Sequence, residues 1–150
     1  MKLKIGDPAP MFTATTTDDS TVKLSDYLGT KLVLYFYPMD DTPGCTKQAC
    51  SLRDHNQEIQ DKGAAILGVS TQDAASHRRF TEKYHLNFPL IADTDGAVAR
   101  AYGAVGGGGL MGATASLFGV ANRMTFIIDE SGHIAHISGK PDCANHAEEV

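Results

Sequence analysis

The sequence predicts an α/β fold in which helices cover both faces of a mixed β-sheet. Apolar runs without alternation lie at 32–37, 64–69 and 124–128, as is typical of strands buried on both faces. A helical segment separates the first two runs, so a crossover connection and a mostly parallel central sheet are expected. After the third run, a Ser-Gly turn leads into the alternating segment 133–137, which is typical of the returning arm of a hairpin.

The helices are predicted from their end residues. The segment 43–60 has a proline at its start and Gly63 just past its end, which is the usual asymmetry of helix termini. Asp73 is the expected N-cap of a second helix, 74–84. Shorter elements are expected as helical turns at 25–29 and 97–102, a strand near 88–91, and a hairpin of 12–17 with 21–24. This order predicts a thioredoxin-like sandwich with an N-terminal hairpin extension.

The composition indicates one globular domain over residues 1–150. The chain is long enough to bury a core, and its formal net charge of −5 argues against a nucleic-acid partner. The stretch between Arg100 and Arg123 is uncharged, but it contains the run 106–109 of four glycines. We therefore expect a flexible loop there rather than a membrane span. No targeting segment is evident at the N-terminus.

The cysteine count favours cysteines kept for chemistry or a reducing compartment. Three cysteines are present, whereas a secreted domain of this size normally uses an even number for structural disulfides. We expect a cytoplasmic location, or an organelle such as the chloroplast after removal of a transit peptide.

Cys45 is the candidate nucleophile. It lies in the first turn of the predicted helix 43–60, directly after a buried strand and a loop. Ligands of open α/β sheets bind where strands end, and a helix N-terminus offers free N–H groups and a partial positive charge. A thiol there ionises more readily, and the same N–H groups can hold a polar substrate oxygen. The alternative is a small buried side chain, but the Thr-Pro-Gly context is unlike a core.

Cys50 is the candidate partner of Cys45. In one regular helix, positions five apart have Cα atoms roughly 8–9 Å apart, whereas a disulfide needs less than about 7 Å. A bond between them therefore requires the first turns of the helix to unwind. The alternative for Cys50 is again a small buried side chain. Cys143 is expected to be a spare thiol, with intermolecular pairing as the alternative.

The residues around Cys45 carry a family resemblance. Pro38, Thr42 and Cys45 match the pattern PxxxTxxC of peroxiredoxins. Four longer strings resemble the bacterioferritin comigratory protein, or peroxiredoxin Q, subfamily: TPGCTKQACSLRD at 42–54, NFPLIAD at 87–93, RMTFIID at 123–129 and IGDPAP at 5–10. The resemblance covers nearly the whole chain, although relatives usually continue a C-terminal helix where this chain stops. The glycine-rich segment 105–112 also lacks the charged residues expected of the subfamily.

The resemblance implies a thiol peroxidase that needs no cofactor or metal. Cys45 attacks a peroxide and becomes a sulfenic acid, Cys50 condenses with it, and thioredoxin or a similar dithiol protein reduces the disulfide. Arg123 stabilises the thiolate and orients the peroxide, Thr42 hydrogen-bonds to either, and Pro38 shields the thiolate. Without the resemblance, a solvated surface position is an equally good interpretation of Arg123. For Thr42 the alternative is a helix cap. The subfamily also implies a monomer.

Two rival functions share parts of this chemistry. A general thiol–disulfide oxidoreductase usually carries Cys-x-x-Cys, which is absent here. A redox sensor would use the same Cys45–Cys50 pair to report oxidant to a partner. Substrates are expected to be hydrogen peroxide and organic hydroperoxides, because apolar residues such as Leu110, Met111 and Phe118 predict a rim that accepts alkyl groups. Asp40 and Asp41 are adjacent and are assigned no acid–base role.

Overall fold

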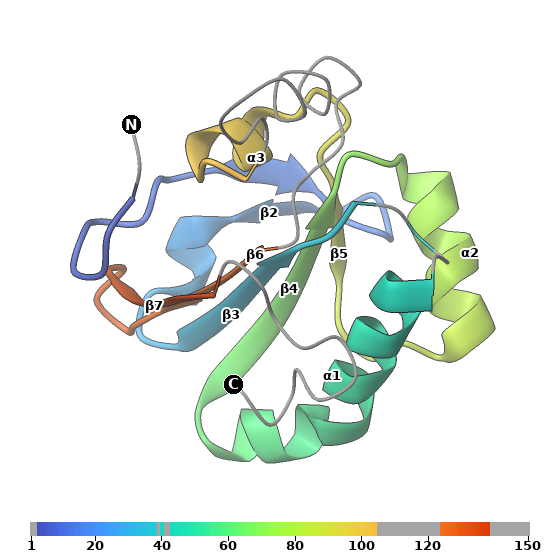
Figure 1. Cartoon of the computed structure of the whole chain (residues 1–150), viewed down its shortest axis with the longest axis horizontal. Coiled ribbons are helices and arrows are strands. Elements are labelled where there is room, and N and C mark those ends of the chain that lie inside the picture. The colour runs from blue at the N-terminus through green and yellow to red at the C-terminus, as the bar shows by residue number, and fades with distance from the viewer. Residues whose placement is uncertain (1–2, 39, 41–42, 105–123, 139–150) are drawn as a thin grey trace.

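The structure is a computed structural model, and it describes residues 3–38, 40, 43–104 and 124–138. Its centre is a five-stranded sheet with the order β5-β4-β3-β6-β7 (Figure 1). The strands are β3 (Lys31–Phe36), β4 (Ala64–Ser70), β5 (Leu90–Ala92), β6 (Met124–Ile128) and β7 (Ile134–Ser138). β4 runs parallel to both of its neighbours, whereas β6 is antiparallel to β3 and to β7. The predicted mixed sheet is therefore confirmed.

Helices lie on both faces of this sheet. One face carries α1 (Pro43–Asp61) and α2 (Ala74–Tyr84). The other carries α3 (Ala97–Ala101), the antiparallel hairpin of β1 (Thr13–Thr15) with β2 (Thr21–Lys23), and the 3₁₀ turn η1 (Leu24–Tyr27) (Figure 1). This arrangement confirms the expected α/β sandwich with its N-terminal hairpin.

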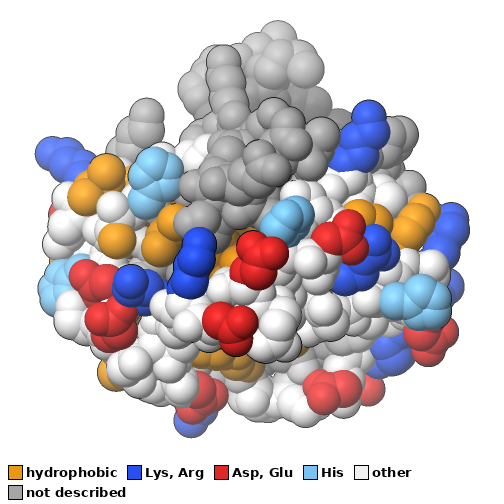
Figure 2. All heavy atoms as spheres, turned by 90° about the horizontal axis from the view of Figure 1, so that it is seen from below, with side chains coloured by type: hydrophobic (Ala, Val, Ile, Leu, Met, Phe, Trp, Pro, Cys, Tyr) orange, Lys and Arg blue, Asp and Glu red, His pale blue; other side chains and the backbone are white. Residues whose placement is uncertain are grey.

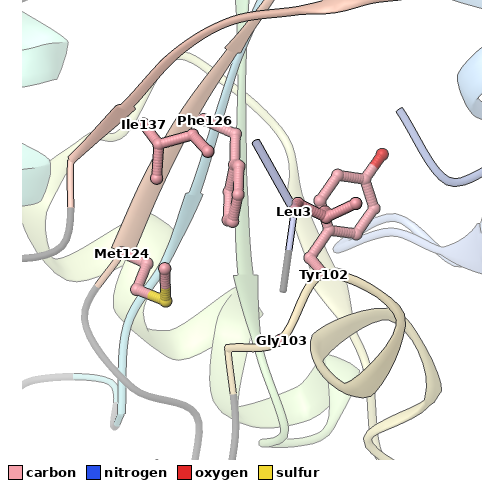
Figure 3. Close-up of a pocket in the computed structure, with 6 residues that line it drawn as sticks. All are labelled: Leu3, Tyr102, Gly103, Met124, Phe126 and Ile137. Carbon is pink, nitrogen blue, oxygen red and sulfur yellow. The ribbon is translucent and has the colours of Figure 1, made fainter. Parts of the chain in front are cut away.

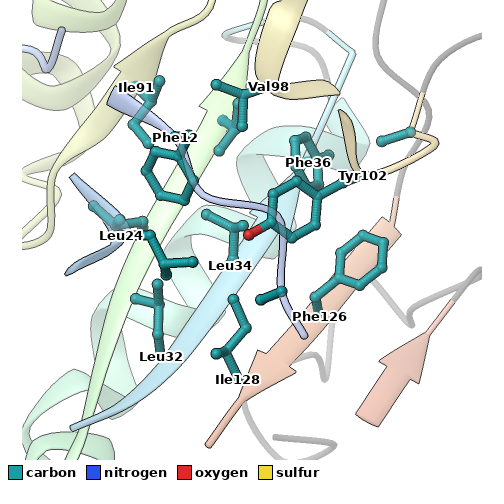
Figure 4. Close-up of a cluster of buried hydrophobic side chains, with 14 of the residues drawn as sticks. Phe12, Leu24, Leu32, Leu34, Phe36, Ile91, Val98, Tyr102, Phe126 and Ile128 are labelled. Carbon is teal, nitrogen blue, oxygen red and sulfur yellow. The ribbon is translucent and has the colours of Figure 1, made fainter. Parts of the chain in front are cut away.

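β3 has an apolar run because its two faces pack into two different cores. Leu32, Leu34 and Phe36 point to the α3 side, where they join aromatic rings such as Tyr102 and Phe126 (Figure 4). Val33 and Tyr35 point to the α1 and α2 side. Because successive side chains of a strand alternate between faces, a strand covered on both sides cannot show a polar–apolar alternation.

Several element boundaries differ by one or two residues from the sequence-based expectation, and two of these differences have a clear cause in the backbone. β5 begins at Leu90 rather than near 88, because Pro89 has no N–H and contributes only its carbonyl, which accepts from the Gly68 N–H at 3.2 Å. α3 ends at Ala101 rather than at 102, since Gly103 takes a φ of 69° and turns the chain away. Both differences arise from backbone groups at the element ends and leave the topology unchanged.

Gly68 allows β4 to pack closely against its surroundings. A Cβ at this position would lie 2.6 Å from Leu90 Cδ2 and 2.9 Å from the Tyr35 ring. Such distances are shorter than normal contacts, so a larger residue would displace the tyrosine. The glycine in the middle of a buried strand therefore creates the space that Tyr35 occupies on the α1 side.

The N-terminal segment pairs with the start of the last strand. The Gly6 N–H donates to Ile134 O at 2.7 Å, and the Ile134 N–H donates to Asp7 O at 2.9 Å. Further along, the Ala9 N–H donates to Gly132 O at 2.9 Å. These bonds fix residues 6–9 along the outer edge of the sheet, where β7 has no second neighbour among the described strands.

The surface in Figure 2 carries acidic and basic side chains interspersed with one another. On the described part of this face, the mixture differs from the single-sign basic surface that phosphate binding uses. No helix in the described ranges has both the length and the apolar character needed to cross a membrane.

The N-cap of α2 gives the first testable prediction. As expected from the sequence, the Asp73 carboxylate accepts from the Ser76 N–H at 2.8 Å. Replacing Asp73 by alanine leaves this N–H without its cap and is expected to lower the free energy of unfolding by about 0.5–2 kcal/mol. Urea unfolding followed by circular dichroism measures the loss. The exposed Glu82 of the same helix is the matched control: Glu82→Ala should change stability by less than about 0.5 kcal/mol, and equal losses would contradict the capping role.

Candidate active site

The candidate site lies where the parallel strands end. β3 is followed in the chain by α1, and β4 leads through residues 71–73 into α2. Because β3 and β4 are parallel, both connections leave from the same edge of the sheet. In open α/β sheets this edge is where ligands bind. The chain just ahead of α1 therefore meets the start of α2.

Cys45 lies in the first turn of α1, as predicted, but its setting is more buried than the sequence suggested. Its side chain is 1% exposed and packs in the apolar cluster that includes Tyr35, Tyr37, Ala49 and Leu52. The cysteine occupies the helix face that packs into the core on this side of the sheet, which explains the burial. The sulfur therefore lies at the positive end of the α1 dipole with little surrounding water, where that field is weakly screened.

Cys50 lies in the same helix and is partly exposed, and both cysteines carry thiols that are not joined in a disulfide. Five residues correspond to a rotation of about 140° around a regular helix, so the two side chains leave it in different directions. Their Cα separation in such a helix, roughly 8–9 Å, exceeds the limit for a disulfide. Both cysteines therefore lie in one helix, which is the arrangement that makes unwinding necessary before a disulfide can form.

The other predicted site residues are only partly covered by the structure. Pro38 is half-buried, and its carbonyl accepts from Ser70 Oγ at 3.4 Å, which ties the chain after β3 to the end of β4. Thr42, Arg123 and Cys143 lie outside the described residues, as does the glycine-rich segment 105–112 with its predicted apolar rim. The structure thus brings Pro38 and Cys45 to the same edge of the sheet.

A buried contact between Asp40 and His77, close to Cys45, was missed by the sequence reasoning. Asp40, which was assigned no acid–base role, has a side chain only 4% exposed, and its Oδ2 lies 2.7 Å from Nδ1 of the fully buried His77. The same carboxylate accepts from the Tyr37 hydroxyl at 2.6 Å and from Ser76 Oγ at 2.7 Å. The other ring nitrogen of the imidazole, Nε2, lies 2.9 Å from Ile91 O in β5.

The electrostatics of this cluster favour an ionised carboxylate. Burial by itself raises the pKa of Asp40, but the hydrogen bond and charge of His77, with the Tyr37 and Ser76 hydroxyls, outweigh it and hold the pKa below the ordinary value of 3.8. Since a depressed carboxyl pKa stabilises the folded state above the unfolded pKa, this contribution is complete above about pH 5 and is lost as the pH falls through the lowered value.

Tyr37 joins the ion pair to the cysteine. Burial raises the pKa of Tyr37 well above its usual value of 10, and the charges of Tyr35, Asp40 and Cys45 and the hydrogen bond to Asp40 act in the same direction. The phenol therefore stays protonated, and its O–H donates a hydrogen bond to the Asp40 carboxylate. Because Tyr37 packs in the same cluster as Cys45, the polar cluster lies one side chain away from the candidate nucleophile.

The sequence did contain a sign of the buried histidine. His77, Phe80 and Tyr84 are spaced by three and four positions in α2, so they share one helix face. The rings of Phe80 and Tyr84 lie 5.5 Å apart, and that face packs on the sheet. An imidazole on the apolar face of a helix needs buried partners, and this requirement would have pointed to a carboxylate on a neighbouring loop.

A separate cavity of about 50 Å³ lies on the opposite face of the sheet (Figure 3). Its described lining is formed by Leu3, Tyr102, Gly103, Met124, Phe126 and Ile137. That lining includes none of the predicted site residues and offers no charged or nucleophilic group. The part of the chain that the structure describes also contains no group of three His, Cys, Asp or Glu side chains able to hold a metal ion.

Comparisons with known proteins agree with this fold. The family model described as AhpC/TSA matches residues 5–137. The chain is 40% identical over 148 residues to peroxiredoxin Bcp of Escherichia coli strain K12, an alignment that covers 99% of this chain and 93% of the relative. The structure resembles that of a cysteine-to-serine mutant of Xylella fastidiosa PrxQ with a TM-score of 0.88 and 27% identity, covering 99% of this chain and 93% of that one.

A second solved structure has a higher sequence identity. It is the Xanthomonas campestris bacterioferritin comigratory protein, studied for its alkyl peroxide reduction activity. The TM-score is 0.81 and the identity 30%, over 92% of this chain and 86% of the other.

Proposed function

The chain belongs to the AhpC/TSA family and is a peroxiredoxin, a thiol-dependent peroxidase; from that premise we propose that it reduces hydrogen peroxide and organic hydroperoxides with Cys45 as nucleophile and Cys50 as resolving thiol. The observation that carries the proposal is that both thiols belong to α1, with Cys45 in the first turn at the strand-end edge of the sheet. The activity of the Xanthomonas campestris relative on alkyl peroxides supports the inclusion of organic substrates.

The first chemical step is attack of the Cys45 thiolate on one peroxide oxygen. The O–O bond breaks, the sulfur gains the attacked oxygen and becomes a sulfenic acid, and the other oxygen leaves as an alkoxide or hydroxide that takes up a proton. The N–H groups at the start of α1 favour negative charge at this position.

The second step forms a disulfide. The Cys50 sulfur attacks the sulfenic sulfur, the S–O bond breaks, and water leaves, so that the oxidation level stays on the two sulfurs. Because the helix holds the two sulfurs apart, the first turns of α1 unwind before the bond closes. An external dithiol, which we propose is thioredoxin or a similar protein, then reduces the disulfide by exchange.

The remaining predicted residues have supporting roles in the proposal. Arg123 places a fixed positive charge beside the thiolate and the peroxide. Thr42 donates to or accepts from the peroxide through its hydroxyl, and Pro38 limits access of water. We further propose that the protein acts as a monomer in a reducing compartment such as the cytoplasm, since three cysteines suit chemistry better than structural disulfides.

Mass spectrometry after one equivalent of peroxide tests the pairing. The fully reduced protein is treated with hydrogen peroxide, free thiols are blocked, and the chain is digested without reduction. We expect one new linked peptide pair, Cys45 with Cys50, and an intact-mass loss of two hydrogens with no added oxygen. A link that involves Cys143 instead, or an untouched Cys45, would refute the assignment. Parallel reactions with cumene hydroperoxide test the organic substrate.

A further inference from the structure

We propose that the Asp40–His77 ion pair is a positioning device that holds the chain leading into α1 against α2, so that Cys45 is fixed for attack and the unwinding that follows is confined to α1. The inference rests on the proposed function, because it assigns a role within that reaction. Both residues act on the reacting sulfur indirectly, through the backbone that carries it.

Pro38 and Asp40 are fastened to the β4–α2 connection and to α2 by three sets of contacts. Pro38 O accepts from Ser70 Oγ at 3.4 Å, and the Asp40 N–H donates to Gln72 Oε1. The Asp40 side chain then reaches Ser76 and His77 in the first turn of α2. Asp40 lies five residues before Cys45, so these contacts anchor the chain just ahead of the helix start. Figure 1 shows α1 and α2 on the same side of the sheet.

The hydrogen-bond partners determine the charge of the cluster. Both ring nitrogens of His77 face acceptors, Ile91 O at 2.9 Å and the Asp40 carboxylate at 2.7 Å. An imidazole that donates from both nitrogens carries two protons and a positive charge. The carboxylate accepts from three donors, the Tyr37 and Ser76 hydroxyls and the imidazolium. The depressed pKa of Asp40 is consistent with that ionised form.

A buried pair of this kind favours one arrangement strongly. Separating Asp40 from His77 would leave two charges in an interior from which water is excluded, and such a change is much less favourable than breaking a surface pair. The chain before α1 therefore has one well-defined anchor point while the pair is intact. The same anchoring stops the fraying of α1 from spreading back toward β3.

Anchoring by Asp40 and His77 predicts opposite effects on sulfenic acid formation and on disulfide formation. With Asp40→Asn, the ring of His77 donates only from Nε2, the ion pair is lost, and hydrogen bonds of similar shape remain. We expect sulfenic acid formation at Cys45 to slow by about 10- to 100-fold, as is typical of small misplacements at a reacting centre. Disulfide formation from the sulfenic acid should be at least as fast as in the wild type, because the anchor that limits unwinding is weaker.

Rapid chemical quenching separates these steps in a chain without tryptophan. Reduced protein is mixed with peroxide, quenched at intervals in acid, and analysed for thiol, dimedone-trapped sulfenic acid and disulfide. Glu82→Ala is the matched control, since Glu82 is exposed on α2 and is not one of the anchoring residues; its rates should stay within about threefold of the wild-type rates. Imidazole ¹⁵N spectra at neutral pH should show two protonated ring nitrogens for His77 in the wild type and one in Asp40→Asn.

The outcomes distinguish the two proposals. Equal rates for wild type and Asp40→Asn would overturn the positioning role, as would parallel slowing of both steps together with a lower unfolding midpoint, which indicates only a structural defect. A wild-type His77 ring with a single protonated nitrogen would overturn the ion-pair assignment. By contrast, absence of any Cys45–Cys50 disulfide in the wild type would refute the proposed function itself.

Discussion

Cys45→Ser is expected to abolish peroxide consumption, reducing the rate to that of the uncatalysed reaction between peroxide and reductant, a loss of at least about a thousandfold. Serine nearly preserves the volume of a side chain that is 1% exposed in the α1-side core. Its hydroxyl is not ionised at neutral pH and cannot form a sulfenic acid or a disulfide. A coupled assay with thioredoxin, thioredoxin reductase and NADPH measures the turnover.

Cys50→Ser is the matched control for this result. This variant keeps the nucleophile, so it should form a sulfenic acid with one equivalent of peroxide per chain but no intramolecular disulfide, and catalytic turnover should cease. Continued exposure to peroxide should add further oxygens to Cys45, since no second thiol protects it. Full turnover by Cys45→Ser would show that the reacting sulfur lies elsewhere. Normal recycling of Cys50→Ser by thioredoxin would show that Cys50 is not the resolving thiol.

Phe36→Ala is expected to lower the free energy of unfolding by about 3–5 kcal/mol. Phe36 is fully buried in the middle of the α3-side core, with its ring centre 5.7 Å from that of Tyr102 and 5.8 Å from that of Phe126 (Figure 4). Removing the ring leaves a cavity that the rigid sheet cannot close. Equilibrium unfolding in guanidinium chloride, followed by circular dichroism, measures the change.

Two further variants interpret that measurement. Leu28 is 52% exposed, so Leu28→Ala should change stability by less than about 0.5 kcal/mol. If Phe36→Ala does not fold, Phe36→Leu retains much of the side-chain volume and should lose less, within about 3 kcal/mol. A loss below about 1 kcal/mol for Phe36→Ala in a folded variant would show that the aromatic cluster does not support β3.

The fold was predictable because its strongest local patterns agree with its tertiary structure. The doubly buried strands β3 and β4 have no polar alternation, and the N-cap Asp73 and the boundaries of α2 were predicted residue by residue. Two of the boundary errors fall where backbone groups decide the end of an element. Pro89 delays the start of β5, and Gly103 ends α3 one residue early. Neither effect can be weighed without knowing which strand pairs with which.

The site was predictable only where the residues follow one another along the chain. Cys45 and Cys50 could be placed in one helix because their spacing and the preceding turn are local features. The partner of Asp40 is 37 residues away along the chain, and its burial depends on how α2 packs on the sheet. A carboxylate in a polar loop sequence looks solvent-exposed until the fold brings a histidine against it.

The pairing of residues 6–9 with the turn before β7 also bears on how the molecule meets its own copies. A free strand edge presents unpaired N–H and C=O groups that a second chain can extend into a longer sheet. Here the Gly6 N–H and Asp7 O occupy the two backbone groups of Ile134. The leading peptide thus serves as an intramolecular guard against edge-to-edge aggregation at the start of β7.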